Sequence, residues 1–264
     1  MAIAILGILS FLPPASSGGA AFVAAAYVFY GVLFLAACNA CRHAGVNATD
    51  ILGTVPNETR SLVMPVYIAP LLLVFAGLSL WVTVFIASAV APDWATGLLS
   101  RQERSSMTAL FHGNQRALLA ANVALIGPFV EEVVFRGMLL RRWVESRGVL
   151  TGVFGSAAVF AVLHPPSWLG AFVTGVVLGV IYLWSRSLLI PVLIHVLYNG
   201  IIALMVMSEG DSSRVRASGE TGIAALRSEW APLSIAFLLT AALIIAIIGP
   251  LLREVRDRRA LATR

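Results

Sequence analysis

The sequence predicts an all-α membrane protein, a polytopic bundle of about seven transmembrane helices. Of its 264 residues, 59% are hydrophobic and only 12% are charged, whereas a soluble domain averages about 25% charged residues. The mean hydropathy of +0.91 agrees. The apolar residues also fall in runs of the length that crosses a bilayer, about 20 residues per helix. Little of the chain is left for a separate soluble domain.

Seven segments are long and apolar enough to span. No charged residue precedes Arg42, so the first span lies before it. Residues 1–12 would cover only about 18 Å as a helix, so we expect a partial or interfacial segment there; if they do span, the total is eight. Pro165 and Pro166 cannot continue a helix, so the fourth span should end near His164. The predicted spans are residues 20–41, 63–90, 117–140, 148–164, 168–184, 188–207 and 232–252.

The segments between the spans are more polar. Residues 91–116 are expected to form a loop and an interfacial helix, and residues 208–230 a polar loop. Gly175 and Gly179 form a GxxxG pair on the fifth span, which predicts close helix packing. The chain then divides into an N-terminal hydrophobic region (1–114), a core with four spans (115–207), and a loop, final span and basic tail (208–264).

The arginines indicate the orientation of the bundle. The segments after spans one, three, five and seven share one side and hold eleven arginines, whereas the other side holds six. The positive-inside rule places the richer side, and with it the C-terminus, in the cytoplasm. We expect an integral protein of a bacterial inner (cytoplasmic) membrane. The net charge of +5 suits contact with anionic lipid, and no basic patch interleaved with aromatic residues favours nucleic acid.

Three charged residues lie inside the third span: Glu131, Glu132 and Arg136. Each costs about 3 kcal/mol in a membrane and persists when it is paired, lines a water-filled cavity or does chemistry. Glu132 and Arg136 are four residues apart with the acid first, the favourable order for an intrahelical pair. Glu131 points about 100° away and would face a cavity as a general base. The reverse assignment of the two glutamates fits the same spacing.

Two histidines and an asparagine add to this polar set. His164 ends the fourth span, while His195 and Asn199 share one face of the sixth. Such groups polarise a carbonyl, ligate a metal, hold an oxyanion, or hydrogen-bond between helices. Pro128 and Pro191 lie just before the polar residues, and each removes a backbone donor and frees a carbonyl one turn earlier. We therefore expect kinks beside an intramembrane catalytic cavity.

Other hydrolase signatures are absent from the sequence. It contains no HExxH zinc-protease motif and no GxSxG nucleophile motif. The two aspartates that precede residue 208, Asp50 and Asp93, both lie outside the predicted spans. A paired-aspartate intramembrane site is therefore not expected.

The polar residues resemble three motifs of the CPBP family of intramembrane proteases, also called the Abi or CAAX-protease family, which includes the type II CAAX prenyl endopeptidases. EExxxR is matched by Glu131, Glu132 and Arg136; FxxxH by Phe160 and His164; HxxxN by His195 and Asn199. The order and spacing fit, and the resemblance covers about residues 115–207. Outside it the chain is similar only in being hydrophobic.

The resemblance implies an intramembrane endopeptidase that acts near the C-terminus or membrane anchor of a protein or lipidated-peptide substrate. Glu131 would activate a water, with His164 assisting it or ligating a metal, while His195 and Asn199 would hold the substrate carbonyl and the oxyanion. Glu131, His164 and His195 would be the ligands of a Zn²⁺ ion, if one takes part; a glutamate-driven mechanism without metal is also argued for the family.

Two other functions fit the sequence. A non-catalytic immunity or scaffold protein of the same fold would use Glu132 and Arg136 as structural links only. A transporter would use the buried charges as a proton relay, although the chain has no inverted repeat to support this.

The predicted spans contain one geometric conflict. The predicted spans place Glu131 about 15 Å from the end of its helix near Arg141, but His164 about 20–25 Å from the start of the next helix. The two residues meet only if the helices tilt, if the fourth span starts near Phe154, or if a span boundary is wrong.

Overall fold

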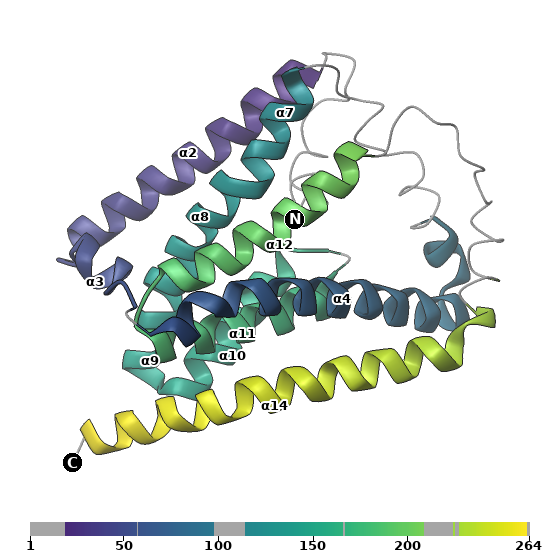
Figure 1. The fold of residues 1–264 in the computed structure, drawn as a ribbon. Helices are drawn as coiled ribbons and strands as arrows, with labels where there is room; N and C mark the ends of the chain where they lie inside the picture. The colour runs from purple at the N-terminus through teal and green to yellow at the C-terminus, as the bar shows by residue number, and fades with distance from the viewer. Residues whose placement is uncertain are drawn as a thin grey trace.

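The computed structural model describes residues 19–56, 58–97, 114–165, 167–208, 224 and 227–262. Within these ranges the chain is helical, with one isolated β-bridge between Gly53 and Ser187 and no strand. The predicted all-α membrane bundle is therefore confirmed (Figure 1). The helices are α2 (Gly19–His43), α3 (Ala48–Leu52), α4 (Thr59–Val90), α7 (Asn114–Ala121), η2 (Asn122–Ile126), α8 (Gly127–Glu132), η3 (Val133–Leu140), α9 (Arg141–Arg147), α10 (Val149–Val162), α11 (Trp168–Ser185), α12 (Leu189–Ser208) and α14 (Trp230–Ala262).

Each of the seven predicted spans is a helix in the structure. Five helical stretches are long and apolar enough to cross a membrane: α2, α4, the run from α7 to α9, α11 and α14. The other two predicted spans are shorter apolar helices, α10 and α12. The predictions for residues 1–12, most of the 91–116 segment and most of the 208–230 loop fall outside the described residues.

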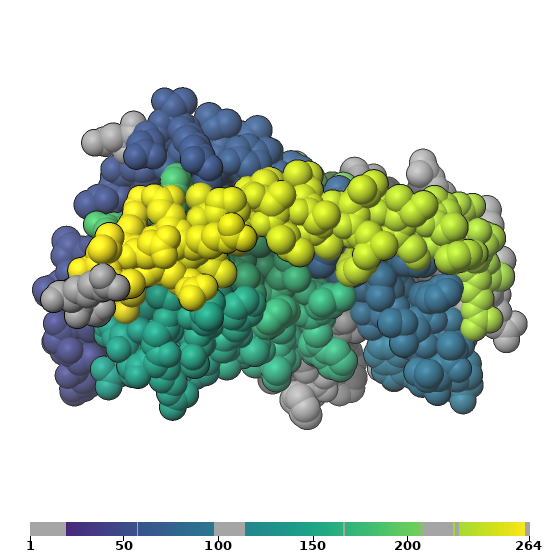
Figure 2. All heavy atoms as spheres, turned by 90° about the horizontal axis from the view of Figure 1, so that it is seen from below, coloured from purple at the N-terminus to yellow at the C-terminus, as the bar shows by residue number. Residues whose placement is uncertain are grey.

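The bundle is built around α11, which packs against α4, α10, α12 and α14. The long α14 lies across the outside of this group, over α4 and the teal and green helices (Figure 2). On the other side, α2 packs against the run from α7 to η3 and forms a small apolar cluster with it, separate from the main core. The run from α7 to α9, which carries the acidic residues, is thereby held between α2 and the central helices (Figure 1).

Four segments that were predicted to share one side of the membrane meet at one end of the bundle. Gly53, after α2, bridges to Ser187, after α11. Arg141, at the start of α9, donates to the carbonyl of Asp50, and Arg259 of α14 donates to the carbonyl of Val144 at 3.1 Å. At the opposite end, Arg227 donates to the carbonyl of Ser88 at 2.9 Å. These contacts agree with the predicted alternation of the spans.

The third helix is longer than the sequence predicted, and this removes the conflict in depth. The predicted span ended at Leu140, where the apolar run ends, but the helix continues through α9 to Arg147. Charged residues end an apolar run without ending a helix; Gly148, with φ of 86°, ends it. Glu131 is then sixteen residues from the turn and His164 fifteen residues from Val149, about 20–24 Å in both cases.

The GxxxG pair lies where α11 meets α10, the most extensive helix contact of the bundle. A Cβ added at Gly175 would lie only 2.9 Å from the backbone Cα of Ala157, whereas one added at Gly179 would meet a flexible Leu140 methyl group at 3.5 Å. The two glycines therefore differ: the first allows the backbones to approach, and the second is open enough for a methyl group.

We expect Gly175→Ala to lower the free energy of unfolding by about 1–3 kcal/mol, the usual effect of overpacking. The matched change Gly179→Ala should shift it by less than about 1 kcal/mol. Thermal unfolding in detergent measures both. Equal effects of the two substitutions would contradict this account of the α10–α11 contact.

Candidate active site

The helix that carries the acidic motif is irregular where the motif lies. Two π-helical stretches, η2 and η3, flank the α-helical turn of α8 that ends with Glu131 and Glu132. Short π-helical stretches inside α-helices are rare and often lie at functional sites. The wider turns leave backbone groups that need partners from elsewhere, because lipid offers none.

Pro128 accounts for one backbone group that needs such a partner, the carbonyl of Val123. In η2 the N–H of Gly127 donates to the carbonyl of Asn122, five residues earlier. The next bond in this pattern would join residue 128 to Val123, but proline has no N–H. The side-chain amide of Asn199 donates to the Val123 carbonyl instead, at 3.0 Å. The predicted freed carbonyl is therefore present, and Asn199 of α12 satisfies it.

Glu132 is the centre of a buried polar group. Its Oε1 atom accepts hydrogen bonds from Arg136 Nη1 at 2.6 Å and from His195 Nδ1 at 2.7 Å. Arg136 also donates to the carbonyl of Gly175 at 3.4 Å, and its guanidinium lies 4.9 Å from the ring centre of Phe160. The predicted Glu132–Arg136 pair is present, and the structure adds His195 to it.

Glu131 has different partners. Its Oε1 atom accepts a hydrogen bond from the hydroxyl of Tyr30 at 2.8 Å. Its Oε2 atom is buried, has no hydrogen-bond partner in the described part of the protein, and lies 3.9 Å from His164 Nε2 and 3.8 Å from His195 Nε2. These separations are too long for direct hydrogen bonds and are of the size that one bridging water spans.

His164 is held by the residue one turn before it. Its Nδ1 lies 2.6 Å from the carbonyl of Phe160, and because a carbonyl only accepts, Nδ1 carries the proton. The two rings also stack, with centres 4.1 Å apart. In the neutral form of this ring, Nε2 is therefore the unprotonated nitrogen, and this atom faces Glu131. α10 ends at Val162, so the prediction that the fourth helix ends near His164 is confirmed.

The structure thus gathers Glu131, Glu132, Arg136, His164, His195 and Asn199 from three helical stretches into one buried region, and all six are less than a tenth exposed. Sequence reasoning missed Tyr30, which comes from α2. Tyr30 could have been found in the sequence, because a tyrosine in the middle of an apolar span has a hydroxyl that needs a hydrogen-bond partner. The sequence analysis also missed Asn122, whose buried side-chain amide has no partner in the described residues.

The zinc ligands suggested by the resemblance do not have zinc geometry here. The described residues hold no group of three or more His, Cys, Asp or Glu side chains placed to bind a metal ion. Two ligand atoms of tetrahedral zinc lie about 3.3–3.6 Å apart, whereas Glu131 Oε2 is 3.9 and 3.8 Å from the nitrogens of His164 and His195. Zinc binding by this set stays a prediction.

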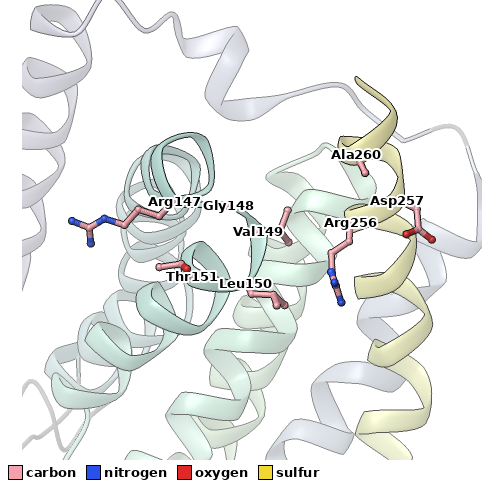
Figure 3. A pocket seen from close by; sticks show the side chains of 8 residues that line it. All are labelled: Arg147, Gly148, Val149, Leu150, Thr151, Arg256, Asp257 and Ala260. Carbon is pink, nitrogen blue, oxygen red and sulfur yellow. The ribbon is translucent and has the colours of Figure 1, made fainter. Parts of the chain in front are cut away.

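A surface pocket of about 470 Å³ lies elsewhere, at the start of α10 beside α14 (Figure 3). Arg147, Arg256 and Asp257 are its charged residues. None of the residues around Glu131 lines it. This pocket is therefore separate from the buried polar region.

Two comparisons with known proteins confirm the resemblance that the three motifs predicted. Residues 113–201 match the model of the Rce1-like type II CAAX prenyl endopeptidase family. The chain is also similar to the membrane-embedded CAAX protease MroQ of Staphylococcus aureus (strain USA300), with 29% identity over 93 residues. That alignment covers 31% of this chain and 36% of the relative, so the chain spans about a third of the length of the curated relative that it matches. No solved structure matches the chain.

The two adjacent glutamates should differ in their effect on stability. Glu132→Gln leaves the Arg136 guanidinium buried without an anion, which costs about 3–5 kcal/mol. Glu131→Gln keeps an acceptor for Tyr30 and should cost about 1 kcal/mol or less. Thermal unfolding of both variants in one detergent measures the difference. Equal losses would contradict the separation of their partners.

The Val123 carbonyl supplies a second test. Asn199→Ala removes its donor and should cost about 1–3 kcal/mol, the penalty for a buried unsatisfied group. Adding Pro128→Ala restores a backbone N–H within reach and should recover part of this loss. Unfolding of the two single variants and the double variant measures the coupling. Strictly additive losses would show that the two residues do not share the carbonyl.

Proposed function

We propose that this chain is an intramembrane endopeptidase that hydrolyses a peptide bond with Glu131 as its general base. The observation that supports this most is the placement of Glu131 Oε2, buried and facing the Nε2 atoms of His164 and His195. A carboxylate oxygen and two imidazole nitrogens that converge at this spacing suit a water molecule. The resemblance to a family of membrane proteases supports the same reaction.

The proposed reaction begins with this water. Glu131 takes a proton from it, and the resulting hydroxide attacks the carbonyl carbon of the scissile bond. His164 accepts a hydrogen bond from the water through its unprotonated Nε2 and so orients it. The C–N bond then breaks, and Glu131 delivers its proton to the leaving amine.

His195 is placed to serve the oxyanion. Its Nδ1 donates to Glu132, which fixes the ring, as a carboxylate fixes the histidine of a catalytic triad. Its Nε2 lies 3.8 Å from Glu131 Oε2. With a proton on Nε2 as well, the ring would carry a positive charge between two carboxylates and would donate to the oxyanion. An additional oxyanion contact from Asn199 is part of the proposal, alongside its bond to Val123.

The arginine distribution supports the proposed orientation, and the family resemblance supports the proposed substrate class. We place the arginine-rich end, with the C-terminus, in the cytoplasm of a bacterial inner membrane. The substrate class is a protein or lipidated peptide cut near its C-terminus or membrane anchor. Glu131, Glu132 and Arg136 lie in a helical run that is long and apolar enough to cross a membrane, and this supports the proposal that a membrane-bound substrate reaches the site without leaving the bilayer.

Glu131→Gln should lower the rate of peptide cleavage about 10²–10⁴-fold, the usual contribution of a general base, with little change in the unfolding temperature. Glu145→Gln is the matched control, because Glu145 lies on the same helix and is exposed; its rate should match the wild type. Cleavage is measured on a panel of prenylated and transmembrane peptides, and zinc is quantified in the same preparation.

The results of these assays distinguish a glutamate-driven protease from a non-catalytic membrane protein and from a metalloprotease. Full activity of Glu131→Gln would show that this residue is not the base. No cleavage of any peptide by the wild type, with Glu131→Gln still functional in cells, would favour the non-catalytic partner. Stoichiometric zinc, lost together with activity in His164→Ala and His195→Ala, would favour the metal mechanism.

A further inference from the structure

We propose that Tyr30 of α2 is a positioning residue for the general base, which orients the Glu131 carboxylate toward His164 and His195. This inference rests on the proposed function. Tyr30 lies far outside residues 113–201, the segment that matches the protease family. It would make the N-terminal helix a working part of the active site.

The hydrogen bond between the two side chains is buried and specific. Tyr30 is 2% exposed and Glu131 7%, and the Tyr30 hydroxyl lies 2.8 Å from Glu131 Oε1. The tyrosine ring packs with Val23, Leu119 and Val130 in the apolar cluster between α2 and the third helix. This packing fixes the ring, so the hydroxyl approaches the carboxylate from a set direction.

Glu131 needs such a partner because its own torsions do not fix the carboxylate. The last torsion of a glutamate side chain is broad, with no sharp minimum. A hydrogen bond on Oε1 fixes the carboxylate plane and thereby aims Oε2. Without it, the carboxylate could turn in its buried space, and a displacement of about 1 Å costs a catalytic site up to about a hundredfold in rate.

It also matters for catalysis that the group bound to Glu131 is an uncharged phenol. Glu132 is held by Arg136 and His195, and the arginine neutralises its charge. Glu131 is held by a phenol, which donates a hydrogen bond and brings no charge. The carboxylate is therefore oriented and still able to take a proton from water. A cation in the place of Tyr30 would hold the carboxylate equally well and would weaken it as a base.

The test compares two tyrosines of the same helix. Tyr30→Phe removes only the hydroxyl and keeps the ring in its cluster. Tyr27→Phe is the matched control, because the Tyr27 hydroxyl also links α2 to the third helix, by donating to the carbonyl of Leu118 at 3.0 Å, but does not touch Glu131. Purified full-length variants are assayed for kcat and KM on whichever peptide the wild type cleaves.

We expect Tyr30→Phe to lower kcat by about ten- to hundredfold, the range of a hydrogen bond to a charged group, with KM within about twofold of the wild type. Tyr27→Phe should change neither constant by more than about twofold. Wild-type kcat in Tyr30→Phe would overturn the proposal. Equal losses in the two variants would overturn it as well, because they would show that α2 only needs to be docked.

A second measurement does not depend on activity. Unfolding temperatures are compared for the wild type, Tyr30→Phe, Glu131→Leu and the double variant. Losses that do not add show that the two side chains are bonded, and additive losses overturn the proposal. If the bond is present but the wild type cleaves no peptide, the proposed function fails and the positioning role fails with it, while the contact itself stands.

Discussion

The hydrogen-bonded group of Glu132, Arg136 and His195 is the interaction on which the rest of the site depends. Burying Glu132 or Arg136 alone would be costly, and Glu132 Oε1 makes burial tolerable by accepting hydrogen bonds from both Arg136 and His195. Arg136 extends the group to the Gly175 carbonyl and the Phe160 ring. One ionic group therefore links η3, α10, α11 and α12. Since Phe160 also holds His164, this group sets the positions of both histidines.

The irregular third helix and the polar residues around it form a single system. In a regular α-helix the backbone N–H and C=O groups bond to one another. No carbonyl would then be left for a side chain of α12 to bind. Pro128 and the π-helical turn leave the Val123 carbonyl free, and Asn199 binds it, one helical turn from His195. The irregularity thus anchors α12 beside the acidic residues. The helix is widened here, and a side chain from another helix satisfies the backbone carbonyl that this leaves free, as a membrane interior requires.

The sequence predicted the helices well because a bilayer imposes a simple length and composition on each span. The end of the apolar run did not predict the end of the third helix, because charged residues from Arg141 onward end the run but not the helix. The helix ends at Gly148. The Glu132–Arg136 pair follows from helical spacing, but the bond from His195 does not, because it joins residues 63 apart. Spacing along one helix cannot show which face meets another helix. For the same reason Tyr30 looked like one more aromatic residue of an apolar span.

The two sides of the third helix, which runs from α7 to α9 and carries Glu131 and Glu132, are held by different kinds of contact. On the side of α10, α11 and α12, Glu132, Arg136 and His195 bind one another, and the residues of the three motifs all fall in the segment that matches the protease family. On the side of α2, the contact is an apolar cluster of its own with one buried hydrogen bond to Glu131. The first set gives Glu131 no direct hydrogen bond, because its two histidines lie 3.9 and 3.8 Å from Oε2. Tyr30 of α2 supplies the bond that orients this carboxylate, through Oε1, so similarity confined to residues 113–201 does not mark the limits of the site.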